Sequence, residues 1–238
     1  MVSSQIGPDG LRDCFRDPIP EIFEAATLLD RAVSAHHAGR FSEAEELLVA
    51  ADMERIGDWT SSIWFTPQKN KVPGIEAKIG TAPIVPESQR HQLRDATQPM
   101  KRALVARDGF HCQFCAIPLV RVEVRKALSQ IYPIAVRWDQ NNKPRMQHFA
   151  LEAMWLQYDH VEPHARGGMT TMENILVTCA VCNYGRERFT LGQVAFRDPR
   201  LTARKPTWSG WQDWDGLERL LPEPKRIAGP RNLSAKQG

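Results

Sequence analysis

Two pairs of cysteines, each separated by two residues, are the first feature of the chain that could do chemistry: Cys112 with Cys115, and Cys179 with Cys182. Tetrahedral zinc prefers four soft ligands, and two such turns supply four thiolates, so the spacing predicts a closed structural zinc site. Redox-active dithiols and unligated cysteines are the alternatives. Because four thiolates fill the zinc shell, we expect any reaction to take place elsewhere.

A second group of residues lies between the two cysteine pairs and just past the second: Asp159, His160, Asn174 and Asn183. A histidine can take a proton from water near neutral pH. A carboxylate and an amide oxygen suit a hard cation such as Mg²⁺, which thiolates would bind badly. An Asp-His pair alone is also typical of a surface pair or a hydrogen-bonded core histidine. Its place between the two cysteine pairs favours a catalytic site.

Three stretches of the sequence carry a family resemblance: RALVARDGFHCQFC, YDHVEPHARGG and MENILVTCAVCNYGRER. In this order they resemble the zinc-containing branch of the histidine-asparagine-histidine (HNH) nuclease family, over residues 97 to 190. The resemblance implies an α+β fold built on a ββα-metal finger, also called a His-Me finger, stapled by the four-cysteine zinc site. In that fold two antiparallel strands carry His160 and Asn174, and a helix that starts near Cys179 presents Asn183.

The same resemblance implies a role for each residue of the finger. His160 would be the general base for a water molecule that attacks phosphorus, and Asp159 and Asn183 would hold a catalytic Mg²⁺ or Mn²⁺ ion. Asn174 would orient the histidine and brace the loop. The last position departs from the family's name, because Asn183 stands where a histidine is expected, and we interpret it as an oxygen ligand.

The predicted function is that of a metal-dependent HNH endonuclease that hydrolyses DNA phosphodiester bonds, with RNA as a second possible substrate. The alternative is a subunit that does not cleave: a zinc-stabilised nucleic-acid-binding or assembly protein of a defence or mobile-element system. Basic residues could contact the nucleic acid, although a solvated charged surface or an ordinary loop histidine would explain them too. These candidates are Arg186, His164, Lys101, Arg102 and Arg107.

Composition sets wider limits on the function. The chain has 238 residues with 31 Lys and Arg against 28 Asp and Glu, a net charge of +3, which permits a nucleic-acid partner without requiring one. No apolar run is long enough to cross a membrane, and the first residues do not resemble a secretion signal. We therefore expect a cytoplasmic protein with no membrane partner. The oligomeric state stays open.

The sequence predicts three regions. A helical N-terminal region covers 1–95 and could bind a protein partner, and it includes a linker rich in Pro and Gly at 66–88. The nuclease domain covers 96–195 with an insertion at 118–150, and a C-terminal helical tail covers 196–238 with a disordered end.

Within these regions, a first helix is predicted from Pro20 to the stop at Gly39. A second helix would begin with a capping box of Ser42 and Glu45, and a third at Thr97. The insertion contains a predicted helix, VEVRKALSQIY, and a turn at Asn141-Asn142. WLQYDHVEP is predicted as a strand and ENILVTC as the next ordered element. The spacing of Trp208, Trp211, Trp214, Leu217, Leu220 and Leu221 predicts a final amphipathic helix.

Overall fold

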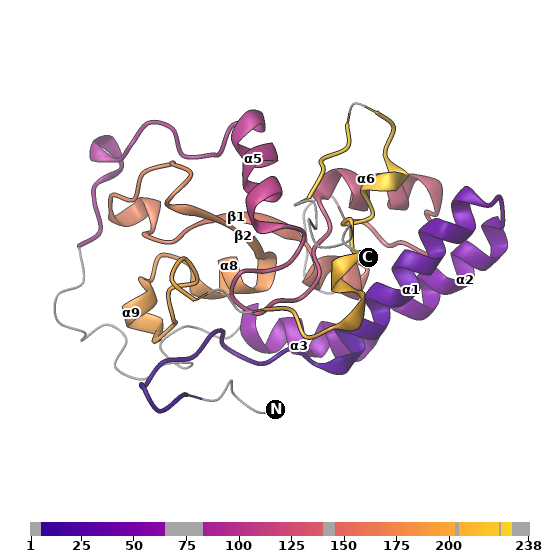
Figure 1. The fold of residues 1–238 in the computed structure, drawn as a ribbon, viewed down its shortest axis with the longest axis horizontal. Coiled ribbons are helices and arrows are strands. Elements are labelled where there is room, and N and C mark those ends of the chain that lie inside the picture. The colour runs from indigo at the N-terminus through magenta and orange to yellow at the C-terminus, as the bar shows by residue number, and fades with distance from the viewer. Residues whose placement is uncertain (1–5, 65–82, 140–145, 203–204, 224, 230–238) are drawn as a thin grey trace, which may run out of the picture.

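The computed structural model describes residues 6–64, 83–139, 146–202, 205–223 and 225–229. The fold is α+β, with helices around a single pair of strands in this part of the chain (Figure 1). None of the described helices is both long and apolar enough to span a bilayer. In chain order the elements are α1 (Pro20–His37), α2 (Phe41–Ala51), α3 (Glu54–Trp64), the 3₁₀ turn η2 (Glu87–Gln89), α5 (Gln98–Asp108), α6 (Val122–Ile131), α7 (Phe149–Ala153), β1 (Leu156–His160), η3 (His164–Arg166), β2 (Ile175–Cys179), α8 (Ala180–Arg186), α9 (Leu191–Val194), η4 (Ser209–Gln212) and η5 (Glu218–Leu220).

The two predicted N-terminal helices, α1 and α2, form an antiparallel hairpin at one side of the molecule. Pro20 begins α1, and the chain reverses at Gly39, whose φ of 75° lies in the left-handed region that glycine favours. The predicted capping box at Ser42 is wrong. Helix α2 begins one residue earlier, at Phe41, and its N-cap is Arg40, which makes no side-chain capping bond.

Helix α3, which the sequence pattern did not lead us to expect, joins the hairpin to the strands. It buries Ile56, Trp59 and Ile63, at helical spacing, against α7 and α8. A Cβ atom at Gly57 would lie 2.6 Å from the ring of Phe149, so glycine allows α3 and α7 to pack closely. Polar residues lie between these buried positions, so the helical spacing of the apolar residues is difficult to recognise in the sequence.

The helices around the first cysteine pair agree with the sequence. Helix α5 begins after Thr97, whose hydroxyl accepts a hydrogen bond from the amide of Met100 at 3.4 Å. Helix α6 lies within the predicted insertion and buries Val124 and Leu128. Helix α5 packs on β2, which places the turn that follows α5 beside the strand pair.

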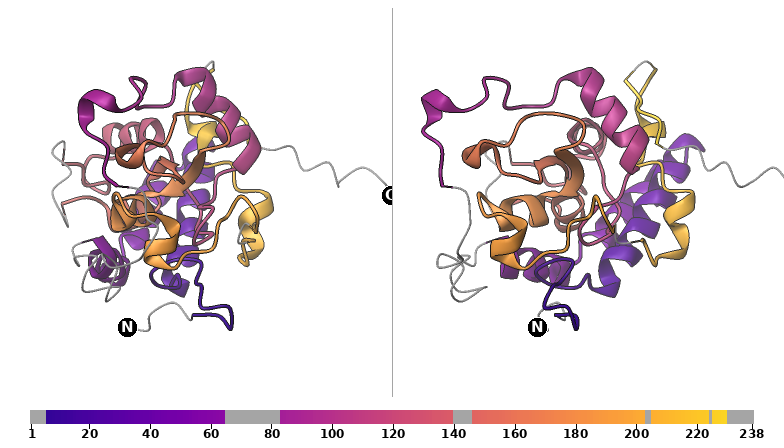
Figure 2. Two further views of the ribbon diagram at one scale, coloured as in Figure 1. Left: turned by 90° about the vertical axis from the view of Figure 1, so that its left-hand side faces the viewer. Right: turned by 60° about the vertical axis from the view of Figure 1, so that its left-hand side comes forward.

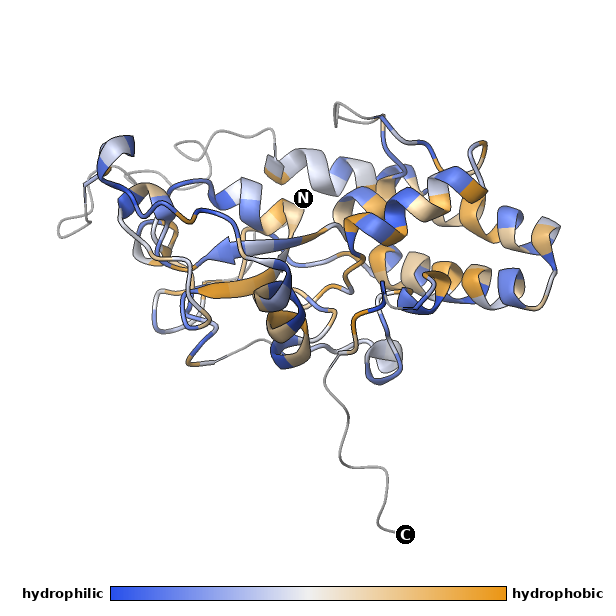
Figure 3. Cartoon of the chain, turned by 90° about the horizontal axis from the view of Figure 1, so that it is seen from above, coloured by the Kyte–Doolittle hydropathy of each residue, from blue (hydrophilic) through white to orange (hydrophobic). Residues whose placement is uncertain are grey.

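Strands β1 and β2 pair antiparallel, with Leu156 opposite Cys179 and His160 opposite Ile175. Every residue of β2 is buried, whereas β1 ends in the polar residues Asp159 and His160, and Figure 3 shows this contrast between a hydrophobic and a hydrophilic strand. Helix α8 follows β2 directly and packs against both strands. The predicted ββα finger is therefore present, beside the four cysteines.

A segment that we call the arm, residues 83–97, leads into α5 and arches past the loop between β1 and β2 (Figures 1 and 2). The amide of Val85 donates to the carbonyl of Ala165 at 2.9 Å, and Nε2 of His164 lies 2.8 Å from the carbonyl oxygen of His91. Backbone of the arm is thus hydrogen-bonded to the finger.

The C-terminal tail differs from its prediction. In place of one amphipathic helix, the structure has two short 3₁₀ turns, η4 and η5. Gly216, at φ 67°, separates them and lies against the ring of Phe110, which a Cβ atom there would overlap. Trp214 is nevertheless buried, and its indole donates to the carbonyl of Leu119 at 3.1 Å. The tail therefore covers the turn after α5 without forming a helix.

Some expectations fall outside the described residues. They are most of the linker at 66–88, the turn at Asn141-Asn142, and the end of the chain after residue 229. The division into three regions stays a prediction. A single cluster of buried apolar residues includes members from α1, β2 and the tail, for example Leu29, Val177 and Leu217.

Candidate active site and zinc centre

The four cysteines of the two pairs gather into one cluster. Their Sγ atoms all lie within 4.8 Å of one another, and those of Cys115 and Cys179 are 3.7 Å apart. A tetrahedron of thiolates at Zn–S distances of about 2.3 Å has edges of about 3.8 Å, which the separation of Cys115 and Cys179 matches. All four cysteines are buried, and the cluster is consistent with a structural zinc ion.

Backbone amides support the sulfur atoms. The amide of Cys115 donates to Sγ of Cys112 at 3.5 Å, and the amide of Cys182 donates to Sγ of Cys179 at 3.3 Å. Such bonds favour the thiolate form that binds a metal. Cys179 is also the last residue of β2 and the N-cap of α8, so the sulfur cluster fixes the direction in which α8 leaves the strand.

Three of the four predicted site residues converge on one cavity. Asp159 and His160, at the end of β1, and Asn183, on α8, line a polar cavity of about 290 Å³. Lys101 of α5 and Arg94 of the arm complete part of its wall. The strand pair makes this possible because β2 returns the chain beside β1 and α8 then crosses back toward the end of β1.

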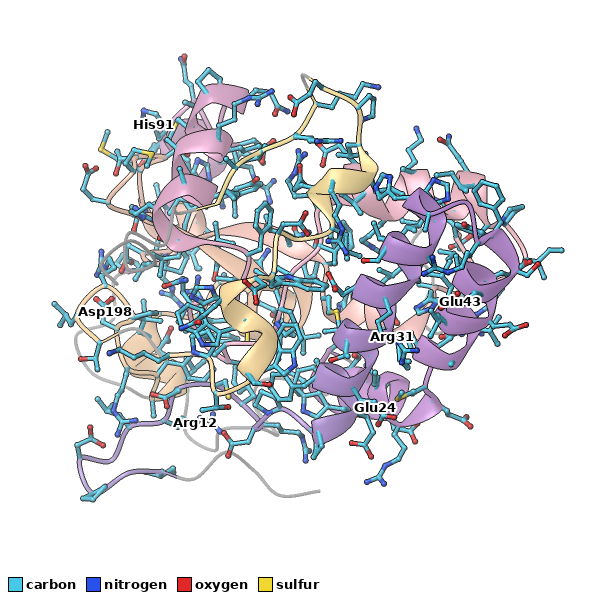
Figure 4. The ribbon with its side chains drawn as sticks, turned by 45° about the vertical axis from the view of Figure 1, so that its right-hand side comes forward. Arg12, Glu24, Arg31, Glu43, His91 and Asp198 are labelled. Carbon is cyan, nitrogen blue, oxygen red and sulfur yellow. The ribbon has the colours of Figure 1, made fainter. Side chains whose placement is uncertain are left out.

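An adjoining cavity of about 350 Å³ shares Asp159, His160 and Asn183 with the first. His164 lines it from the loop after β1, and Arg188 lines it from the turn that follows α8. The rings of His160 and His164 lie 5.7 Å apart between centroids. His91, labelled in Figure 4, belongs to the arm at this side of the molecule, and its carbonyl accepts the hydrogen bond of the His164 ring.

Asn174 lies one residue before β2, not on the strand as expected, and it closes the loop between the strands. Its Oδ1 accepts from the amide of Glu162 at 2.8 Å, and its Nδ2 donates to the carbonyls of Glu162 and Met169 at 3.1 and 2.9 Å. Gly168 lies against this bond, because a Cβ atom there would overlap the Glu162 carbonyl oxygen. Among the described residues, no hydrogen bond joins Asn174 to His160, so the amide braces the loop and not the imidazole itself.

His160 is held in a form that can accept a proton. Burial lowers the pKa of His160 to about 4, and its electrostatic interactions with His164, Arg186 and Arg94 act in the same direction. The imidazole is therefore neutral at neutral pH. Its Nε2 lies 2.9 Å from Oγ1 of Thr170, a residue of the loop that Asn174 braces.

Arg186 was expected to contact nucleic acid, and that prediction is wrong. Its side chain has an exposed fraction of 0% and bonds to both oxygens of Asp159, with Nη2 2.6 Å from Oδ1 and Nε 3.2 Å from Oδ2. Its remaining bonds go to the carbonyls of His160, Val161 and Phe189. A guanidinium that is buried and bonded in this way has no donor left for a phosphate in solution.

The donor set around Asp159 fits a hard divalent cation. Each carboxylate oxygen has two lone pairs and receives one hydrogen bond from Arg186, and Asp159 lines the polar cavity. Asn183 adds an amide group at the same cavity. Mg²⁺ is commonly held by one or two protein oxygens and several waters, so these two residues suffice in kind and number.

The other candidate nucleic-acid contacts divide into two groups. Lys101 and His164 line the cavities. Arg102 and Arg107 do not: Arg102 donates to the carbonyl of Arg226, whereas Arg107 is paired with Asp108 and donates to the carbonyls of Met172 and Ile175. Arg107 therefore links α5 to the start of β2. The contact of Arg102 with nucleic acid stays a prediction.

Arg94, Thr170 and Tyr184 were not singled out in the sequence, although all three lie at the site. Arg94 and Tyr184 line both cavities, and Tyr184 directly follows Asn183. That adjacency was a usable signal for Tyr184. Arg94 carried none, because the arm precedes the segment that resembles the family and contains no periodic pattern.

The two strands, helix α8 and the four-cysteine cluster together form a ββα finger of the kind that the sequence predicted. Residues 146–188 match the family model described as HNH endonuclease, so the chain carries an HNH endonuclease domain. The match includes Asp159, His160, Asn174 and Asn183 and stops short of the first cysteine pair. A domain of this kind implies a nucleic-acid substrate. Searches of curated proteins and of solved structures gave no match.

Proposed function

We propose that the chain is a metal-dependent endonuclease that hydrolyses phosphodiester bonds of DNA. The observation that carries the proposal is the convergence of Asp159, His160 and Asn183 on one polar cavity, from the end of β1 and from α8. Phosphodiester hydrolysis needs a base that activates water and positive charge near the phosphate, and both kinds of group line this cavity.

His160 is the proposed general base. Because its pKa is lowered to about 4, the imidazole is unprotonated at neutral pH and ready to take a proton from a water molecule. The loop after β1 is closed by the hydrogen bonds of Asn174 to Glu162 and Met169, which keeps the base at the mouth of the cavity.

Asp159 and Asn183 are the proposed residues that would hold a Mg²⁺ or Mn²⁺ ion. Such an ion supplies positive charge that stabilises the phosphate as negative charge accumulates on its oxygens. Arg186 keeps the Asp159 carboxylate in place by its two hydrogen bonds. Arg186 is thus a support for the site, and its charge compensates that of the buried carboxylate.

Arg94 and Lys101 are the proposed contacts to the nucleic-acid backbone, since both line the cavity that contains His160. Backbone contacts of this kind read charge and not base identity. DNA is the proposed substrate on the strength of the family resemblance, and RNA is the substrate to compare with it.

The test is cleavage of a supercoiled plasmid in the presence of Mg²⁺ or Mn²⁺, with and without a chelator. His160→Ala should lower the cleavage rate by on the order of 10²-fold or more, because general-base help contributes that much. The matched control is His37→Ala, at an exposed histidine of α1, which should cleave like the parent.

The zinc content of His160→Ala should equal that of the parent, because the imidazole bonds to none of the four cysteines among the described residues. If His160→Ala cleaves at the parental rate, the assignment of the base is wrong. If the parent retards DNA in a gel but leaves it uncut with either ion, the alternative of a non-cleaving binding subunit takes its place.

A further inference from the structure

Thr170 links the arm to His160. The side chain is buried, with an exposed fraction of 6%, and lies in the loop between β1 and β2. Its Oγ1 is 2.9 Å from Nε2 of His160, 2.5 Å from the carbonyl oxygen of Leu93 and 3.1 Å from that of Arg94. One hydroxyl thus contacts the imidazole and two backbone carbonyls at once.

The direction of these hydrogen bonds follows from counting protons. A threonine hydroxyl has one proton to donate and two lone pairs that accept, whereas a carbonyl oxygen can only accept. Because the hydroxyl is at hydrogen-bond distance from the carbonyls of Leu93 and Arg94, its proton is directed toward the arm. The bond to His160 can then form only if Nε2 carries a proton and donates it to Oγ1.

We infer that Thr170 is a positioning residue for the base: its hydroxyl, oriented by the arm carbonyls, keeps the proton of the neutral imidazole on Nε2 and leaves Nδ1 as the atom that accepts a proton from water. Nδ1 has no hydrogen-bond partner among the described residues. This inference rests on the proposed function of His160 and adds to it the reacting atom and the residue that selects it.

The inference extends the functional unit beyond the segment that matches the family. Leu93 and Arg94 precede residues 146–188 by about fifty positions, and they contribute backbone oxygens, which no sequence pattern displays. The arm is itself fastened to the loop by the bond between His164 and the His91 carbonyl. Orientation of the base therefore depends on how the arm lies against the finger.

The direct test determines which ring nitrogen of His160 carries the proton. Protein labelled with ¹⁵N in its seven histidines is studied at pH 7.5 by long-range ¹H–¹⁵N correlation, which distinguishes a protonated from an unprotonated ring nitrogen. The His160 signals are assigned by their absence in His160→Gln. The parent should show a proton on Nε2 of His160. A proton on Nδ1 would overturn the inference, whether or not the protein cleaves DNA.

Variants connect the tautomer to the rate. Thr170→Val keeps the shape and removes the hydroxyl; it should give a mixed or reversed tautomer and a kcat lower by on the order of 10- to 100-fold, with KM unchanged. Thr170→Ser restores the hydroxyl and should restore both readouts. Thr178→Val is the matched control, because that hydroxyl is buried on β2 without a hydrogen-bond partner among the described residues.

The outcomes separate this inference from the proposed function. An Nε2 proton that persists at full rate in Thr170→Val would refute the role of the hydroxyl while leaving His160 as the base. A protein that never cleaves would refute the proposed function, and the tautomer would still report what Thr170 does to the imidazole.

Discussion

Arg186 holds Asp159 by both carboxylate oxygens, at 2.6 Å and 3.2 Å, with neither side chain more than 7% exposed. The two residues come from different elements, α8 and β1, so the ion pair also fastens the helix to the strand. Burial raises the pKa of Asp159, and the neighbouring guanidinium opposes that rise. The pair is thus a structural support placed directly behind the proposed metal ligand.

Loss of Arg186 should therefore cost stability. Arg186→Met leaves a buried carboxylate without its partner, and we expect the free energy of unfolding in urea to fall by about 3–5 kcal/mol. Arg186→Lys keeps the charge but cannot bond to both oxygens in the same way, so it should lie between the parent and Arg186→Met. The exposed neighbour Arg188 provides the control, Arg188→Met, with a change within about 0.5 kcal/mol. Equal effects at the two positions would contradict this account of the pair.

The cysteine cluster should bind one zinc ion per chain. Cys112→Ser removes one of four ligands, and we expect loss of zinc in elemental analysis together with a lower unfolding temperature, because the three remaining sulfur atoms no longer complete a tetrahedron. Cys14→Ala is the matched control, since Cys14 is equally buried but outside the cluster, and it should keep its zinc. Zinc retained in full by Cys112→Ser would show that the cluster is not the site.

Arg94 should contribute to nucleic-acid binding. Arg94→Gln removes one positive charge from the cavity wall, so affinity for DNA should fall and the slope of log K against log salt should become less steep by about 1. Arg31→Gln makes the same change in charge on α1, away from the arm in Figure 4, and should leave the slope unchanged. The same loss of slope in both variants would mean that only net charge matters.

His148 should make stability depend on pH. It is buried at the N-cap of α7, where Nε2 donates to the carbonyl of Leu48 at 2.9 Å, and burial lowers its pKa in the fold. The unfolded chain takes up the proton first, near pH 6.5, so stability is complete above that pH and is lost as pH falls below it. Asp52 and Arg137 face the ring with opposite effects on this pKa.

The measurement compares urea midpoints of the parent and of His148→Gln at pH 7.5 and 5.5. The parent should lose more stability over this interval than the variant, by at most about 1.4 kcal/mol per pH unit, the limit for one proton. An identical pH dependence in both proteins would show that His148 does not titrate with unfolding.

Sequence patterns were sufficient to predict an element where the local signal agrees with the packing in the folded protein. The helix start at Thr97, the helix that begins at Pro20 and the strand that carries Asp159 and His160 are such cases, and each appears as predicted. The grouping of the four cysteines was predictable too, because their spacing matches what zinc requires.

The predictions failed where contacts between residues far apart in the sequence determine the structure. From the sequence, Arg186 is typical of an exposed charge at the end of a short helix. Its burial is explained by the ion pair with Asp159 on the neighbouring strand. The tail fails as a helix because Gly216 must pass close to Phe110. The contact between the arm and Thr170 is of the same kind, since it is made by the backbone carbonyls of Leu93 and Arg94, which side-chain patterns do not reveal.

Cys179 closes β2, belongs to the sulfur cluster and caps α8, the helix that places Asn183 on the cavity wall one turn later. A single residue thus couples the anchoring of the backbone to the position of a proposed metal ligand. We expect oxidation of the cysteines to displace Asn183 and so to lower the proposed cleavage activity, although Asp159 and Asn183 themselves would be chemically unchanged.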